Sequence, residues 1–152
     1  MTKRRKILSA LVVMLWLQTI LNFGIVKVDG ISMQYTLTDG KYYVYANKDL
    51  SRLKRFDIVL VESENLQEMI IKRVVGFPNE EVKMKQGKLY INNEEVIQDF
   101  NYIQEIDNFE ITLGADEYFV MGDNRPNSID SRYIGPINSS EIKHVLVNKK
   151  YW

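Results

Sequence analysis

Cysteine is absent from this 152-residue chain, and histidine occurs only once, at His144. Without cysteine the chain can form neither disulfide bonds nor thiolate metal sites. A single imidazole also argues against a histidine-rich zinc site, which needs several such ligands. We therefore expect no metal ion and no other cofactor.

Acidic residues are missing from the start of the chain, and Asp29 is the first to occur. Four of the 20 basic residues cluster at Lys3, Arg4, Arg5 and Lys6, so the remainder carries 16 basic and 20 acidic side chains. A protein that binds nucleic acid normally presents a basic face to the phosphate backbone. The acidic excess in the remainder argues against nucleic acid as a partner.

Charge is also missing from residues 7–26, which read ILSALVVMLWLQTILNFGIV. A helix of this length can cross a hydrocarbon core of roughly 30 Å. Because basic residues stay on the cytoplasmic side, we predict a cytoplasmic N-terminus at 1–6, a transmembrane helix at 7–26 and an extracytoplasmic domain at 27–152. This topology makes it a single-pass protein of the cell membrane, in contact with the lipid bilayer. A cleaved secretory signal is the main alternative, but the run is long for one and no A-x-A-like site follows it.

The rest of the chain consists of short segments rich in Val, Ile and Tyr, separated by polar residues, which is typical of β-strands. The pairs Gln86-Gly87 and Asn92-Asn93 are plausible hairpin turns. We therefore predict a mostly β fold, a folded sheet or partly closed barrel that carries long functional loops. The predicted strands are 42–46, 57–61, 68–75, 81–84, 88–91, 94–97, 109–113, 118–121 and 142–147.

A serine near the predicted membrane span and a lysine in a predicted strand are candidates for catalysis. The hydroxyl of Ser32 would need a base, and a neutral lysine can serve if burial lowers its pKa. In the strand, Ile70, Lys72 and Val74 share one face, whereas Arg73 points to the other. Taken alone, Lys72 could equally be an exposed edge-strand residue, and Ser32 an ordinary turn residue.

Three motifs, in order, carry a family resemblance over nearly the whole chain. Residues 121–135 match the GDNRxNSxDSRxxG signature of type I signal peptidases. Gly30-x-Ser32-Met33-x-x-Thr36-Leu37 resembles that family's nucleophile box, and Lys72-Arg73-Val74-Val75-Gly76 resembles its base box. Residues 55–59 and 87–96 are similar to two further boxes. The lysine base and small size are similar to the bacterial, Gram-positive-like form.

The resemblance implies a membrane-bound serine endopeptidase that cleaves signal peptides from exported preproteins after small residues. It makes Ser32 the nucleophile and Lys72 the general base, while Ser128 orients the lysine. The Ser32 backbone amide would belong to an oxyanion hole, and Gly30 stands where some relatives carry a second hydroxyl donor. The resemblance also implies a charged scaffold, which we expect to form a partly buried network of Arg73, Asp123, Asp130 and Arg132.

The sequence departs from the family pattern at several places near these motifs. Tyr35 replaces a proline and Phe56 a glycine, while Lys41 and the pair Asn79-Glu80 replace other family residues. These departures leave open a catalytically weak relative that acts as a membrane-anchored assembly factor for surface proteins. A self-cleaving regulator would share the serine–lysine chemistry, but the chain has neither a DNA-binding domain nor a basic face.

Overall fold

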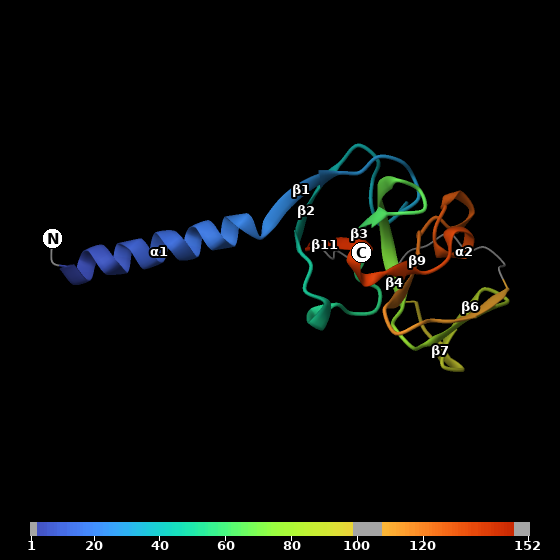
Figure 1. The fold of residues 1–152 in the computed structure, drawn as a ribbon. Helices are drawn as coiled ribbons and strands as arrows, with labels where there is room; N and C mark the ends of the chain where they lie inside the picture. Colours follow the sequence, from blue (N-terminus) through green and yellow to red (C-terminus); the bar gives the residue numbers. More distant parts are fainter. Residues whose placement is uncertain (1–2, 99–107, 148–152) are drawn as a thin grey trace.

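The computed structural model describes residues 3–98 and 108–147, which form one helix at the N-terminus followed by two β-sheets. Helix α1 projects away from the β-rich body, and the two sheets lie together at its far end (Figure 1). This arrangement confirms the predicted mostly β class. Three short 3-10 helices and the one-turn helix α2 (Ser131–Ile134) lie between strands, at Leu50–Arg52 (η1), Arg125–Asn127 (η2) and Ser139–Glu141 (η3).

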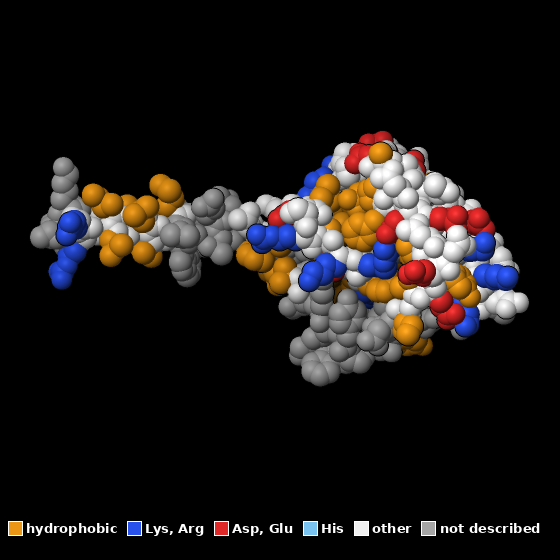
Figure 2. Space-filling view, turned by 90° about the horizontal axis from the view of Figure 1, so that it is seen from below, with side chains coloured by type: hydrophobic (Ala, Val, Ile, Leu, Met, Phe, Trp, Pro, Cys, Tyr) orange, Lys and Arg blue, Asp and Glu red, His pale blue; other side chains and the backbone are white. Residues whose placement is uncertain are grey.

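Helix α1 runs over Lys3–Leu21, so it begins inside the basic cluster and ends five residues before the predicted boundary. Basic side chains lie at its outer end and hydrophobic ones along its first half (Figure 2). Strand β1 (Phe23–Lys27) takes the place of the last predicted helical turn, and alternate residues of β1 are half-buried against β2. Among the described residues, no helix has the combined length and apolarity required to cross a membrane.

The larger sheet has seven strands in the order β1-β2-β11-β3-β4-β9-β10, and each neighbouring pair is antiparallel. Strand β4 pairs with β3 over residues 68–73 but with β9 only from Arg73 onward. The first part of β4 therefore has one edge without a strand partner in the part of the chain that the structure describes. The other strands are β2 (Tyr42–Asn47), β3 (Ile58–Ser63), β4 (Glu68–Gly76), β9 (Glu117–Met121), β10 (Ile137–Asn138) and β11 (Ile142–Leu146).

The smaller sheet has four strands in the order β7-β6-β5-β8, with β5 at Glu81–Lys85, β6 at Lys88–Ile91, β7 at Glu94–Val96 and β8 at Phe109–Thr112. Both predicted hairpin turns are confirmed. Gln86 and Gly87 have φ angles of 51° and 78°, and Asn92 and Asn93 have 50° and 67°. Two consecutive positive φ angles are characteristic of the tight turns that connect antiparallel strands.

Three apolar clusters hold the sheets and loops together. One lies on the β4 face that carries Ile70 and Val74, and the second joins the two sheets around Phe119. The third cluster contains Met33 and Leu37, which anchor the loop between β1 and β2 on the larger sheet. Both side chains are almost completely buried. The residue directly after Ser32 thus fixes the serine loop through ordinary hydrophobic packing.

Most predicted strands are confirmed within one or two residues. Strands β1 and β10 and the short helices were not predicted. Strand β10 pairs only two residues, Ile137 and Asn138, with β9. Such a short segment has too few residues to show a period-two pattern.

Candidate active site

Ser32 lies in the loop between β1 and β2, and the loop that follows β9 holds it in place. The backbone N–H of Asn124 donates to the Ser32 carbonyl oxygen at 2.9 Å. The Asn124 side-chain amide donates to the carbonyl oxygen of Ile31 at 3.1 Å. Together with buried Met33, these bonds fix the backbone on both sides of the serine hydroxyl.

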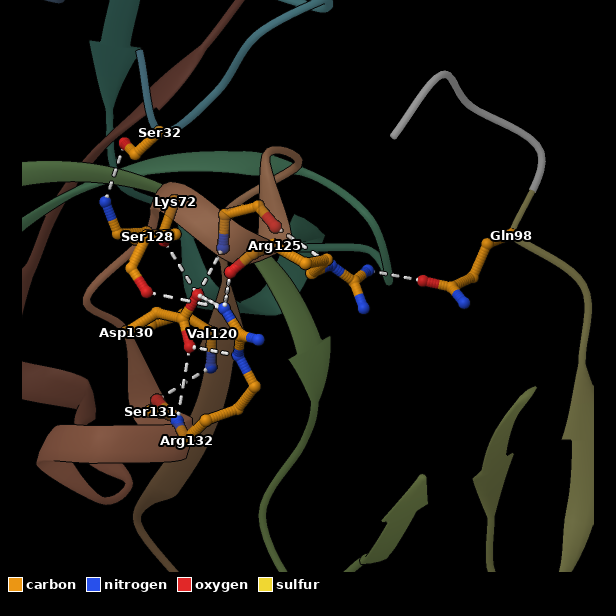
Figure 3. A network of polar contacts seen from close by, with 10 residues as sticks. Ser32, Lys72, Gln98, Val120, Arg125, Ser128, Asp130, Ser131 and Arg132 are labelled. Atoms are coloured by element: carbon orange, nitrogen blue, oxygen red, sulfur yellow. Dashed lines mark hydrogen bonds and ion pairs between the residues drawn. The ribbon is translucent and has the colours of Figure 1, made fainter. Parts of the chain in front are cut away.

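Lys72 comes from the middle of β4, and its Nζ donates a hydrogen bond to Ser32 Oγ at 2.9 Å. Figure 3 shows the two side chains meeting above the loop that carries Ser128 and Asp130. Lys72 is only 4% exposed. The predicted alternation also holds, since Ile70 and Val74 belong to one apolar cluster and Arg73 is bound on the opposite side of the strand. The pair has the distance that a base and its nucleophile require.

Burial lowers the pKa of Lys72 from its ordinary value, because removal from water disfavours the ammonium form. The negative charges of Asp130 and Glu68 oppose this effect, and the positive charge of Arg132 adds to it. The net direction is downward, so neutral lysine forms more readily here than in water. A neutral amine is the form that can accept the serine proton.

Asp130 is completely buried and accepts hydrogen bonds from several directions. Arg132 donates to its two oxygens at 2.9 and 3.0 Å, and the Gly122 backbone N–H donates at 2.8 Å. The Ser128 hydroxyl donates to Asp130 Oδ2 at 2.7 Å. These donors disperse the charge of the carboxylate that acts most strongly on Lys72.

The Ser128 hydroxyl thus has Asp130 as its acceptor, and the structure gives it no hydrogen bond to Lys72 among the described residues. Any influence of Ser128 on the lysine would therefore act through that carboxylate or through packing. The orienting role of Ser128 stays a prediction.

Arg73 and Asp123 form a second buried ion pair on the other side of β4. Arg73 Nε and Nη2 donate to the two Asp123 oxygens at 2.8 and 2.5 Å. Arg73 also donates to the Phe56 carbonyl oxygen at 2.7 Å, and the Thr36 hydroxyl donates to Asp123 at 2.5 Å. This pair connects the serine loop, β4 and the loop after β9, and its role as a scaffold stays a prediction.

Gly30 lies two residues before the nucleophile and has a φ of +97°, a backbone conformation that favours glycine. Its N–H donates to the Asp39 side chain at 2.9 Å. A Cβ atom placed on Gly30 would meet open space. The position where some relatives carry a hydroxyl is therefore open and supplies no side-chain donor in this chain.

A cavity of about 490 Å³ lies beside Ser32 and Lys72, between the β1–β2 loop and the first part of β4. Its lining is mostly aliphatic and includes the β4 stretch that has no strand partner on one edge. The aliphatic side chains come from both walls and from the loop after β9: Val26, Val28, Ile31, Met33, Leu66, Met69, Ile70, Ile71 and Ile129.

Several residues that support the site received no role in the sequence interpretation. Gly122, Asn124 and Thr36 lie inside the quoted motifs, and their contacts connect loops that are distant in sequence. Glu68 lies outside the motifs although it lines the cavity. Motif position could have marked the first three residues, but nothing in the sequence marked Glu68.

Comparison with known proteins shows the family to which the chain belongs. The family model described as signal peptidase, peptidase S26, matches residues 2–149. The chain belongs to this family. This S26 peptidase is 35% identical over 138 residues to signal peptidase I V of Bacillus subtilis, covering 79% of this chain and 81% of the relative. It is 39% identical over 119 residues to signal peptidase I T of the same organism, covering 69% of this chain and 61% of the relative.

The fold of this S26 peptidase is similar to a crystal structure of a signal peptidase I from Enterococcus faecalis. The TM-score is 0.58 at 29% sequence identity, and the match covers 65% of this chain and 100% of the solved one. The relatives and the family model identify this chain as a serine peptidase, a hydrolase.

Proposed function

We propose that this S26 peptidase is a membrane-bound endopeptidase that cleaves signal peptides from preproteins after small residues, with Ser32 as nucleophile and Lys72 as general base. The observation that carries the proposal is the 2.9 Å contact between Lys72 Nζ and Ser32 Oγ, made by a lysine that is buried. The relatives bear the name signal peptidase I, which supports signal peptides as substrates.

In the proposed reaction, neutral Lys72 accepts the proton of Ser32 while Oγ attacks the carbonyl carbon of the scissile bond. The protonated lysine then gives its proton to the leaving amine as the C–N bond breaks. Water attacks the resulting ester, again losing a proton to Lys72, and Ser32 regains its hydrogen when the carboxylic acid leaves.

The backbone N–H of Ser32 is the proposed donor to the oxyanion. Among residues 3–98 and 108–147 it has no backbone acceptor, and the bond from Asn124 holds the carbonyl of the same residue. Removal of one such donor typically costs about 100-fold or more in kcat, so its orientation matters. Gly30 would add no second side-chain donor.

An extended peptide fits the open edge of β4. Residues 68–72 have backbone groups on that edge, and a substrate strand could pair with them by β-augmentation. Such pairing would bring the peptide past Lys72 and the Ser32 hydroxyl. The mostly aliphatic lining would suit the apolar end of a signal peptide.

Membrane attachment rests on the N-terminal sequence. The basic residues before the uncharged run favour a cytoplasmic N-terminus and an extracytoplasmic β-rich domain. An extended chain covers about 3.3 Å per residue, which would keep Ser32 within roughly 20 Å of the end of the predicted span. A signal peptide still held in the bilayer would emerge from the membrane within this distance of Ser32.

The test is cleavage of a preprotein by the detergent-solubilised full chain. We expect Ser32→Ala and Lys72→Ala to abolish cleavage, whereas the controls Ser140→Ala and Lys85→Ala, both at exposed positions, keep it. Cleavage at wild-type rate by Ser32→Ala would disprove the proposed nucleophile.

The departures at Tyr35 and Phe56 leave an assembly factor as the second candidate. In cells, a Ser32→Ala variant that keeps full biological activity would favour that role over peptide cleavage. Loss of both biological activity and preprotein cleavage in the same variant would favour the peptidase.

A further inference from the structure

Glu68 is a charged residue of the catalytic cavity that has no role in the proposed mechanism. It is the first residue of β4 and lies on the same strand face as Lys72, four residues before it. Its side chain is exposed, and it lines the cavity next to Met69 and Ile70. The other charged lining residues are Lys27, Asp29 and Lys72.

The Glu68 carboxylate has no cation or hydrogen-bond donor bound to it in the part of the chain that the structure describes. Two neighbouring acidic residues do have partners. Glu62 pairs with Lys143 at 2.9 Å, and the buried Glu141 accepts the backbone N–H groups of Glu64 and Asn138. Of these three residues, Glu68 is the one that lines the catalytic cavity.

The position of Glu68 lies on the path of an extended substrate. It borders both the catalytic cavity and a neighbouring hollow of about 390 Å³, so it stands where the two meet. A peptide paired with the open edge of β4 advances about 3.3 Å per residue. Glu68 would therefore contact a substrate residue within about four positions of the one beside Lys72.

We propose that Glu68 determines specificity by favouring peptide substrates that carry a lysine or arginine within about four residues of the scissile bond. This inference rests on the proposed function and adds a charge preference to it. If Lys72 is neutral, the cavity holds two carboxylates, Glu68 and Asp29, against one ammonium group, Lys27. A cationic side chain would thus be attracted and an anionic one repelled.

The preference is expected to be modest, because an exposed ion pair gains little in water. We expect kcat/KM for a lysine-containing peptide to exceed that for its glutamate counterpart by about twofold to fivefold at low ionic strength. Added salt should reduce the ratio, since the Debye length falls to about 10 Å at 0.1 M.

The experiment uses the detergent-solubilised full chain and synthetic peptides with alanine at the first and third positions before the bond. Lysine, glutamine or glutamate is placed in turn at each other position among the four on either side. Wild type is compared with Glu68→Gln, Glu68→Lys and the control Glu94→Gln, which removes the same charge from an exposed position of the other sheet.

At one or more positions, the ratio of kcat/KM for the lysine peptide to that for the glutamate peptide should fall to about 1 in Glu68→Gln. It should fall below 1 in Glu68→Lys and stay at the wild-type value in Glu94→Gln. A lysine-to-glutamate ratio that is the same in wild type and both Glu68 variants at every position would overturn the inference. Failure of the wild type to cleave any peptide or preprotein would instead count against the proposed function. The two failures are therefore distinguishable.

Discussion

Arg73 on β4 and Asp123 on the loop after β9 face each other, and both side chains are about 1% exposed. Two hydrogen bonds, of 2.8 and 2.5 Å, join the guanidinium to the carboxylate. Removal of one member of a buried ion pair is expensive, because the other charge remains away from water without its partner. This pair carries no proton in the proposed reaction, so its contribution should appear in stability.

We expect Asp123→Ala to lower the free energy of unfolding by about 3–5 kcal/mol, because Arg73 is then buried without its carboxylate. Chemical denaturation followed by circular dichroism measures the change. Asp116→Ala is a suitable control, since Asp116 is exposed and lies near the start of β9. A loss below about 1 kcal/mol, as for a surface pair, would show that the ion pair is not needed for the fold.

Phe56 has a φ of +70°, at a position where the family pattern has glycine. Its carbonyl oxygen accepts from Arg73 and its N–H donates to the Val74 carbonyl oxygen at 2.8 Å, so the conformation is fixed by both bonds. A residue with a Cβ atom costs about 1–2 kcal/mol in the left-handed region. The partly buried ring offsets this cost by packing against the cluster between the sheets.

Alanine and glycine at position 56 separate the two effects, since both remove the ring. We expect Phe56→Gly to be more stable than Phe56→Ala by about 1 kcal/mol, the reverse of the usual order of these residues. Thermal and urea unfolding of the two variants provide the comparison. Greater stability of the alanine variant would mean that position 56 is not strained.

The serine–lysine pair could be predicted from the sequence because three motifs occur in the order of one family, whereas neither residue taken alone indicated catalysis. The period-two strand pattern correctly separated the faces of Lys72 and Arg73. The sequence did not predict where α1 ends, because residues 23–26 continue the uncharged run of the predicted helix. They form a strand through their pairing with β2. Nor could the sequence predict that Ser128 donates to Asp130, since the acceptor of a hydroxyl depends on tertiary geometry.

Gly122 lies close to Ser128 and Ser32, and no local sequence pattern predicts this proximity. A Cβ atom on this residue would overlap the Ser128 hydroxyl and lie 2.6 Å from the Ser32 carbonyl oxygen. The Gly122 N–H also donates to Asp130 at 2.8 Å, so the backbone has little room to move away. Glycine is therefore required where the loop after β9 touches the nucleophile loop.

We expect Gly122→Ala to reduce kcat/KM for preprotein cleavage by about 100-fold, because a shift of about 1 Å at the nucleophile can have that effect. The measurement is the cleavage rate of folded protein, with circular dichroism to verify the fold. Gly114→Ala is the control, since the nearest atoms to a Cβ there belong to the flexible Glu117 side chain, at 3.2 Å or more. Near-wild-type cleavage by Gly122→Ala would show that the two loops can separate without loss of function.

The titration of Lys72 gives the last prediction, which concerns the pH dependence of cleavage. Neutral Lys72 is the active base, so kcat/KM should rise as the pH increases through the pKa of this lysine. Burial lowers that pKa, while the negative charge of Glu68 raises it. Glu68→Gln removes a charge that favours the ammonium form. The rise of kcat/KM with pH should therefore occur at lower pH than in wild type.

The assay should use an uncharged peptide so that the substrate preference of Glu68 does not contribute. Glu94→Gln should not change the pH at which kcat/KM rises. If that pH is unchanged or higher in Glu68→Gln, this would contradict electrostatic coupling between Glu68 and the catalytic lysine.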